Sequence, residues 1–203
     1  MKRRAILSML LAGCLTSCVR TPPPALQPVR SIAVFPANNR TGDPLLIAGA
    51  SFLEKYVLPT ERYTVADALA AEARAELSQH GFEVMAPQVV EAVTNSQIPE
   101  SAEDAAALAA RHHIEDAVLY IEIRRWESNG GTEPTFIIAA VSATLIEPRS
   151  GRILWTSEHP SQPVPTPGII SLGSAYAVAA HTLMTKLLAP LAPERPALPG
   201  VGY

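Results

Sequence analysis

The spacing of apolar residues follows two different periods along the chain. Short runs rich in β-branched and aromatic side chains are typical of strands, whereas apolar residues repeated every three or four positions indicate helices. The short runs predict strands over residues 30–36, 82–85, 116–126, 135–146 and 153–156. The helical spacing predicts helices over residues 64–80, 88–94, 101–112 and 171–189. The chain therefore begins with alternating strands and helices and ends with three successive strands and a covering helix.

Capping residues mark the helix boundaries. Thr64, with Asp67 three residues later, can cap the first long helix, and Gly81 follows that helix as a stop signal. Ser101 can cap a later helix in the same way. Residues 45–58 give no clear period, so a short helix and an irregular strand both stay open there.

Turn residues separate the last three strands. Gly, Asn, Ser and Pro cluster at residues 128–131 and 148–151, which predicts short connections and an antiparallel meander. The prolines of residues 160–167 predict a loop. The simplest arrangement of these elements is a single mixed β-sheet of about five strands with helices packed on it, an α/β (α+β) fold.

Composition limits the classes of function. The chain has 203 residues, 48% of them hydrophobic, which suits one domain with a substantial core. The net charge is −3, and three of the sixteen basic residues lie within the first four positions, so the folded part is more acidic still and nucleic acid is a poor partner. Both cysteines, Cys14 and Cys18, precede the first strand, so no disulfide is expected in the domain.

The amino terminus has the pattern of a bacterial lipoprotein leader. Lys2, Arg3 and Arg4 precede an uncharged apolar run that is shorter than the ~20 residues of a membrane-spanning helix. The segments Leu-Ala-Gly-Cys and Leu-Thr-Ser-Cys, which end at Cys14 and Cys18, resemble the lipobox of bacterial lipoproteins. In that family the cysteine thiol receives a diacylglyceryl group and the new amino terminus is acylated. The resemblance implies attachment to a membrane through this lipid, and no other cofactor is predicted.

Two cysteines are candidates for the anchor. Cleavage before Cys18 leaves a signal peptide of residues 1–17, within the usual range of about 15–30, whereas cleavage before Cys14 leaves only 13 residues. Cys18 is therefore favoured, and Cys14 stays open because its motif is the better match. The predicted divisions after the signal peptide are a proline-rich tether over 18–29, the α/β domain over 30–190 and a disordered proline-rich tail over 191–203.

Two groups of residues within the domain resemble known lipoproteins. Residues 30–36, with the loop over residues 38–43, resemble the opening strand and loop of the curli-secretion-channel and LpoB-like lipoproteins. Residues 116–121 and 148–155 resemble a family of bacterial outer-membrane lipoproteins of unknown function, whose fold is like the TolB amino-terminal domain. The resemblance covers most of the predicted domain and concerns its architecture.

The resemblance implies a non-enzymatic, lipid-anchored outer-membrane protein that faces the periplasm and assembles with itself or with envelope or export proteins. Neither Leu15 nor Val19 is the aspartate that favours inner-membrane retention in such lipoproteins. No catalytic residues carry over, and the chain lacks the amphipathic hairpin of the channel-forming members, so no pore is expected. The alternative is a periplasmic module that binds a ligand or glycan, which predicts an apolar pocket with converging polar groups.

Surface contact, rather than catalysis, is the role that the sequence suggests. No nucleophile elbow, phosphate loop or dinucleotide fingerprint occurs, and His112 with His113 lacks the further ligands that a metal site needs. The candidate partner or assembly residues are Asn38, Asn39, Arg40, Thr41, Asp43, Trp126 and Trp155. Turn formation is the other explanation for the first five, and core packing for the two tryptophans. The wide apolar face of the last helix favours a homo-oligomer.

Overall fold

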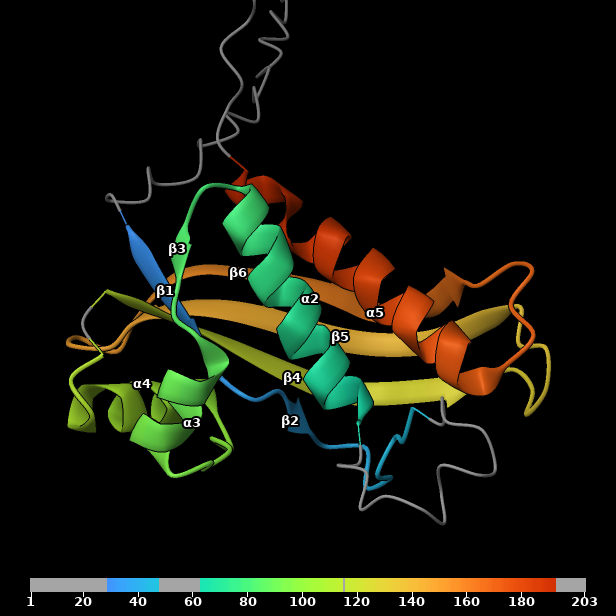
Figure 1. Cartoon of the computed structure of the whole chain (residues 1–203), viewed down its shortest axis with the longest axis horizontal. Helices are drawn as coiled ribbons and strands as arrows, with labels where there is room; N and C mark the ends of the chain where they lie inside the picture. The colour runs from blue at the N-terminus through green and yellow to red at the C-terminus, as the bar shows by residue number, and fades with distance from the viewer. Residues whose placement is uncertain (1–28, 48–62, 115, 193–203) are drawn as a thin grey trace, which may run out of the picture.

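A six-stranded mixed sheet runs through the middle of the domain (Figure 1). The computed structural model describes residues 29–47, 63–114 and 116–192. The strands are β1 (Ser31–Val34), β2 (Asn38–Asn39), β3 (Glu83–Val84), β4 (Ala117–Ser128), β5 (Phe136–Glu147) and β6 (Arg152–Pro165). Their order is β3-β1-β4-β5-β6, with β2 paired to β4. The predicted single mixed sheet is confirmed, with one short strand more than the five expected.

Parallel and antiparallel pairing divide the sheet into two halves. β1 runs parallel to both β3 and β4, with Ile32 opposite Val84 on one side and Ala117 on the other. β4, β5 and β6 form an antiparallel meander, in which Leu145 pairs with both Leu119 and Trp155. Parallel neighbours need long crossover connections and antiparallel neighbours need only tight turns, so the halves match the order of elements in the sequence.

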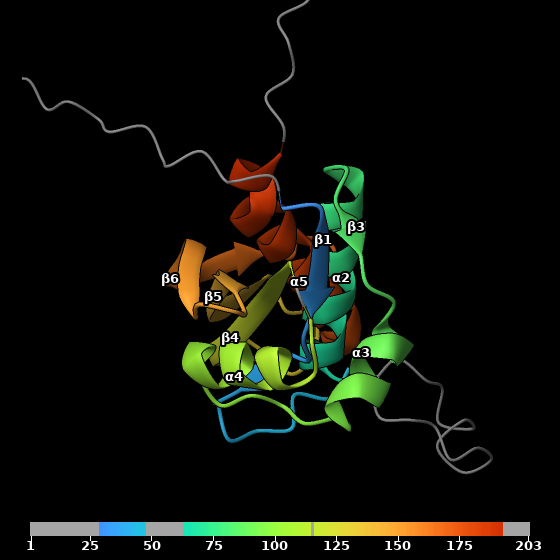
Figure 2. The same cartoon turned by 90° about the vertical axis from the view of Figure 1, so that its left-hand side faces the viewer.

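Four α-helices pack on the sheet within the described ranges. They are α2 (Val65–Gln79), α3 (Pro87–Thr94), α4 (Ala102–Arg111) and α5 (Leu172–Leu188), and a short 3-10 helix η1 (Ala189–Leu191) follows the last of them. α2 and α5 lie side by side on one face of the sheet, and α3 and α4 lie on the other (Figures 1 and 2). No helix in these ranges is long and apolar enough to cross a membrane.

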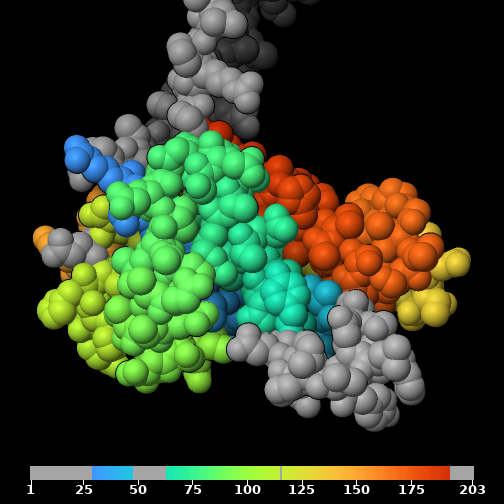
Figure 3. Space-filling model, in the orientation of Figure 1, coloured from blue at the N-terminus to red at the C-terminus, as the bar shows by residue number. Residues whose placement is uncertain are grey.

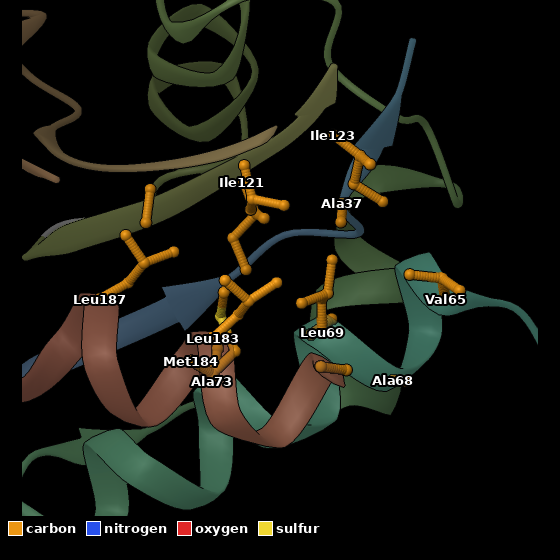
Figure 4. Packing of buried hydrophobic residues seen from close by; sticks show 14 of the residues in the cluster. Ala37, Val65, Ala68, Leu69, Ala73, Ile121, Ile123, Leu183, Met184 and Leu187 are labelled. Carbon is orange, nitrogen blue, oxygen red and sulfur yellow. The ribbon is translucent and has the colours of Figure 1, made fainter. Parts of the chain in front are cut away.

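The larger hydrophobic core lies between the sheet and the pair α2–α5 (Figure 4). Alternate strand residues point to the same face, so Ile121 and Ile123 of β4 both enter this core and are fully buried. Leu69 of α2 and Leu183 and Met184 of α5 lie against them from the helix side. Full burial of one such side chain contributes about 1.5–3 kcal/mol, so this layer supplies much of the free energy of folding.

A smaller core lies on the opposite face, under α3 and α4. Ala33 of β1 and Val118 of β4 alternate with the strand residues of the larger core, and Phe35, directly after β1, joins them. Val90 of α3 and Leu108 of α4 pack on them. These two helices cover the start of β4, and the rest of that strand face has no helix over it among the described residues.

The predicted start of the first long helix is confirmed. The Thr64 hydroxyl accepts a hydrogen bond from the Asp67 amide at 3.2 Å, and the Asp67 carboxylate accepts one from the Thr64 amide at 2.8 Å. This reciprocal pair satisfies two amides that the first helical turn would otherwise leave without partners. Gly81 follows the helix with φ +88°, a conformation that glycine adopts without strain.

The predicted loop over residues 160–167 is wrong for most of its length, because β6 continues to Pro165. Thr166 donates its backbone N–H to Thr135 at 2.8 Å, and backbone groups along a strand point alternately toward and away from the neighbouring strand. Positions Pro163 and Pro165 therefore fall where the N–H would point away from β5. β6 is the edge of the sheet, and an edge strand tolerates proline at such positions.

The loop after β1 also differs from the expectation of a simple turn. Asn38 and Asn39 form β2, which pairs in parallel with Glu122 and Ile123 of β4 before the chain turns at Gly42. Of the ambiguous segment 45–58, the described residues include Leu46, which forms an antiparallel bridge with Thr64. Both leader cysteines, the tether up to residue 28 and the tail from residue 193 lie outside the described residues.

Candidate functional site

The loop that carries five of the candidate residues is organised by its own side chains. The side-chain carbonyl oxygen of Asn39 accepts hydrogen bonds from the Thr41 backbone amide at 3.1 Å and the Thr41 hydroxyl at 2.8 Å. The Asn39 side-chain amide donates to the backbone oxygen of Asp43 at 2.6 Å. Asn and Thr commonly stabilise turns in this way, so Asn39, Thr41 and Asp43 have a structural role in shaping the loop.

Asn38 links this loop to the segment before α4. Its side-chain amide donates to the backbone oxygen of Glu100 and to the Tyr120 hydroxyl, both at 3.1 Å. The Tyr120 hydroxyl in turn donates to the Glu100 backbone oxygen at 3.1 Å. Burial raises the pKa of Tyr120, so this hydroxyl keeps its proton and acts as a donor at neutral pH. Three segments far apart in the sequence are held together by this network.

A groove of about 810 Å³ opens beside that network. It runs between the end of the loop, the segment before α4 and one side of α4 itself. Its lining residues are Asn38, Arg40, Gln97, Ile98, Pro99, Glu100, Ser101, Asp104, Leu108 and Arg111. The structure thus brings Asn38 and Arg40 together with residues that the sequence did not suggest as candidates.

Both signs of charge line the groove, and most of the charged groups have structural partners. Arg40 pairs with Glu122 of β4 at 3.0 Å. The Asp104 carboxylate accepts the Glu100 amide at 3.0 Å, and the Asp104 amide donates to the Ser101 hydroxyl at 3.1 Å, which caps α4. Arg111, in the last turn of α4, has an exposed side chain that makes no hydrogen bond or ion pair within the described ranges.

The two candidate tryptophans lie away from this groove. Trp126 is buried under α5, where its ring meets Tyr176 edge to face with centroids 5.9 Å apart. Its indole N–H finds no acceptor among the described residues. Trp155 is half-buried on β6 and packs against the larger core. Trp126 is therefore a core residue in a single copy of the chain, and Trp155 is partly accessible at the sheet edge.

The histidine pair and Ser174 show no catalytic arrangement. His112 and His113 follow α4, and no group of three or more His, Cys, Asp and Glu residues that could hold a metal occurs in the described part of the chain. The Ser174 amide and hydroxyl both contact the Ser171 hydroxyl, at 3.2 and 2.8 Å, where Ser171 caps α5. Ser174 thus belongs to a helix cap.

Sequence reasoning missed the groove because its walls come from separate segments. The capping signal at Ser101 and Asp104 could place the start of α4, but nothing local indicates that this helix end faces Asn38 and Arg40. Ile98 is the one groove residue that the sequence could have indicated, because it is an apolar side chain in a polar connection. In the structure it is 55% exposed.

No protein-family model and no curated protein matches the chain, but solved structures are similar to it. The PelC dodecamer from Paraburkholderia phytofirmans matches with a TM-score of 0.51 and 19% identity, over 85% of this chain and 96% of PelC. Lipoprotein GNA1162 from Neisseria meningitidis has a TM-score of 0.48 and 20% identity, over 80% and 94%. The LpoB carboxy-terminal domain from Salmonella enterica has a TM-score of 0.40 and 17% identity, over 68% and 84%. The chain therefore has the fold of PelC.

Proposed function

We propose that this protein is a lipid-anchored, non-enzymatic component of the bacterial outer membrane that faces the periplasm, assembles with copies of itself and supports envelope biogenesis or export. The observation that carries the proposal is the combination of a lipobox-containing leader with the fold of PelC, a protein whose crystals contain a dodecamer. Each half of this combination supports a different part of the proposal, and each can be tested separately.

The leader supports the anchor. We favour Cys18 as the lipidated residue, with Cys14 as the alternative. Acyl chains contribute about 0.8 kcal/mol for each buried CH₂, and several chains together hold a protein firmly on a bilayer. Residues 18–29 contain four prolines, and a polyproline II segment of that length would reach roughly 35 Å from the membrane at ~3.1 Å per residue. The domain would then be held close to the membrane without entering it.

The groove supports a contact role more than a catalytic one. Asp104 caps α4, Arg40 pairs with Glu122, and Tyr120 holds the Glu100 backbone in place, so these titratable groups already serve the structure. Catalysis needs groups whose protonation and position are set for a reaction. The charged groups here instead fix the shape of a surface.

The second candidate function, binding of a ligand or glycan in the periplasm, is favoured by the size of the groove. A volume of about 810 Å³ lies within the range of ligand sites. Such sites are usually apolar with a few converging polar groups, whereas charged and amide side chains make up much of this lining. We therefore place this function second. Titration of the purified protein with periplasmic glycans, followed through the amide chemical shifts of Gln97, Ile98, Glu100 and Ser101, tests it.

Labelled palmitate tests the anchor. The wild-type protein and Cys14→Ser should incorporate the label, and Cys18→Ser should not, because the serine hydroxyl cannot form the thioether. Incorporation into Cys18→Ser but not into Cys14→Ser would move the anchor to Cys14. Absence of label from the wild-type protein would overturn the anchor altogether.

The mass of the detergent-extracted, full-length protein tests the assembly. Light scattering should give a multiple of the protomer mass after correction for detergent. A monomer at micromolar concentration would contradict self-assembly while leaving the lipid anchor untouched.

A further inference from the structure

An exposed apolar turn lies between β6 and α5. Ile170 is 82% exposed, and this fraction is the highest among the exposed large hydrophobic side chains of the described residues. It directly precedes Ser171, the cap of α5. An apolar residue at this position commonly packs on the fourth residue of the helix, which here is Ala175 and is itself buried. Ile170 is not buried in this way, so it remains available for contact with another molecule.

The turn that presents Ile170 is held firmly to the rest of the domain. Thr166 is fully buried, and its backbone N–H and its hydroxyl donate to the backbone oxygens of Thr135 and Pro134, both at 2.8 Å. Gly168 turns the chain with φ +74°. These bonds join the turn to the connection between β4 and β5. A side chain on so fixed a base loses little conformational entropy when it is covered.

The groove beside α4 offers a small apolar patch among its charged and amide side chains. Ile98 is 55% exposed at its edge, and Pro99 and Leu108 also line it. Apolar residues that are exposed singly are common on monomers, so Ile170 and Ile98 do not define a contact by themselves. In this chain Ile170 lies on a turn and Ile98 borders a groove, so the turn of one copy can enter the groove of another.

The two surfaces also carry exposed residues of opposite charge. Glu133 lies next to Pro134, in the connection to which the turn is bonded, and it is exposed. Arg111 lies in the groove and is also exposed. Neither side chain has an ion-pair partner within the described part of the chain, so each can pair with the other in a second copy.

The two surfaces lie at opposite ends of the molecule. In Figure 1 the long axis is horizontal; α4 lies at the left, and the orange turn between β6 and α5 lies at the right. Figure 3 shows the orange and yellow segments gathered at the same end of the molecule. A contact that uses two different surfaces can repeat from head to tail, and it closes into a ring when the rotation between copies allows.

We propose that the turn bearing Ile170 in one copy occupies the groove of a second copy, where Glu133 of the first faces Arg111 of the second. Repetition of this contact builds the homo-oligomer. The inference rests on the self-assembly proposed above and adds to it the surfaces that meet.

The first test introduces a charge into the turn. Ile170→Asp in the full-length, detergent-extracted protein should raise the concentration of half-dissociation by about tenfold or more, because a central apolar contact is lost. The matched control is Ile153→Asp, which places the same charge at another exposed isoleucine, on β6. Oligomers of wild-type mass in both variants would overturn the inference. Light scattering measures the mass, and circular dichroism checks that each variant is folded.

The second test reverses the charges. Arg111→Glu and Glu133→Arg should each weaken assembly, and the two reversals combined in one chain should restore it toward the wild-type level. If the doubly reversed protein is as weak as the sum of the single variants, the two residues do not face each other, and that part of the inference is overturned.

The third test identifies which ends meet. Ile170→Cys and Ile98→Cys, mixed and oxidised, should give disulfide-linked dimers, whereas each variant alone and the wild-type protein should not. Dimers from Ile170→Cys alone would indicate a two-fold contact and contradict the head-to-tail arrangement. A monomeric wild-type protein would overturn the proposed self-assembly itself, whereas an oligomer that forms no mixed crosslink would overturn this inference alone.

Discussion

The two faces of the sheet are built from the same strands but differ in their burial and in their charge. On the face under α2 and α5, β4 presents Ile121 and Ile123, which are fully buried. On the opposite face the next positions are Glu122, which is half-buried, and Arg124, which is exposed. The alternation of side chains along a strand lets one segment provide a dry core on one side and a charged surface on the other. Burial decides stability on the first face, and the second is open to contacts.

Interactions on the less covered face are individually weak. Arg124 pairs with Glu158 across the sheet, and the hydroxyls of Thr144 and Thr156 lie 3.4 Å apart. Exposed ion pairs contribute about 0–1 kcal/mol each, far less than a buried leucine. The groove therefore lies on the side of the molecule where substitutions change recognition more readily than they change folding.

Removal of a leucine from each face gives the largest expected difference. Leu183→Ala should lower the free energy of unfolding by about 2–5 kcal/mol, because Leu183 is 1% exposed within the larger core and its loss leaves a cavity. Leu108→Ala should stay near the lower end of that range, because Leu108 borders the groove and water can reach the space. Urea unfolding measures both. Equal losses would mean that the two faces contribute alike.

Loss of a helix cap should lower the free energy of unfolding by a similar amount on either face of the sheet. Thr64→Ala and Ser101→Ala each remove a hydroxyl that accepts an amide of the first helical turn, so each should cost about 1 kcal/mol in the free energy of unfolding. The same urea experiment tests them. A much larger loss for Thr64→Ala would show that its reciprocal bond with Asp67 reinforces the core beneath α2.

Tyr120→Phe probes the network on the less covered face. The change removes the hydroxyl that bonds to Asn38 and Glu100 and should cost about 1 kcal/mol. Burial raises the pKa of Tyr120, so the stability that it contributes is present below its ordinary value near 10 and is lost as the pH rises through the raised value. The variant should therefore lose less stability than the wild type between pH 9 and pH 11. An unchanged alkaline loss would contradict this assignment.

Of these substitutions, His159→Gln should change stability the least, and the change should appear at acidic pH. Burial lowers the pKa of His159, and Lys186 lowers it further, although the Gln162 backbone oxygen 3.4 Å away opposes them. A lowered value means that the stability is present above about 6.5 and is lost as the pH falls through the lowered pKa. Urea midpoints at pH 7.5 and 5.5 should therefore differ less in the variant. A wider difference in the variant would contradict the role of burial.

The sequence predicted the elements better than their lengths. Apolar periodicity, with the caps at Thr64 and Ser101, placed all four described α-helices, since these signals are local. The length of β6 was missed because proline normally argues against a strand, and its tolerance at Pro163 and Pro165 depends on β6 being the sheet edge. Edge position is a property of the whole sheet and cannot be read from one segment.

The candidate loop was predicted, but not its partners. Asn38 and Arg40 were singled out from the loop itself, whereas Ile98, Glu100 and Arg111 enter the groove through tertiary packing. The turn tendency of Asn39 and Thr41 explains their hydrogen bonds within the loop. Trp126 could be assigned to core or surface only once α5 was placed above it.

The prolines along β6 have a consequence for unwanted pairing between sheets. The unpaired backbone groups of an unblocked edge strand can pair with another chain, and such pairing leads to aggregation. Pro163 and Pro165 occupy positions on the outward side of β6 where a backbone N–H could otherwise recruit a neighbour. Replacing both prolines with threonine should favour aggregates of undefined size over oligomers of fixed size at high protein concentration.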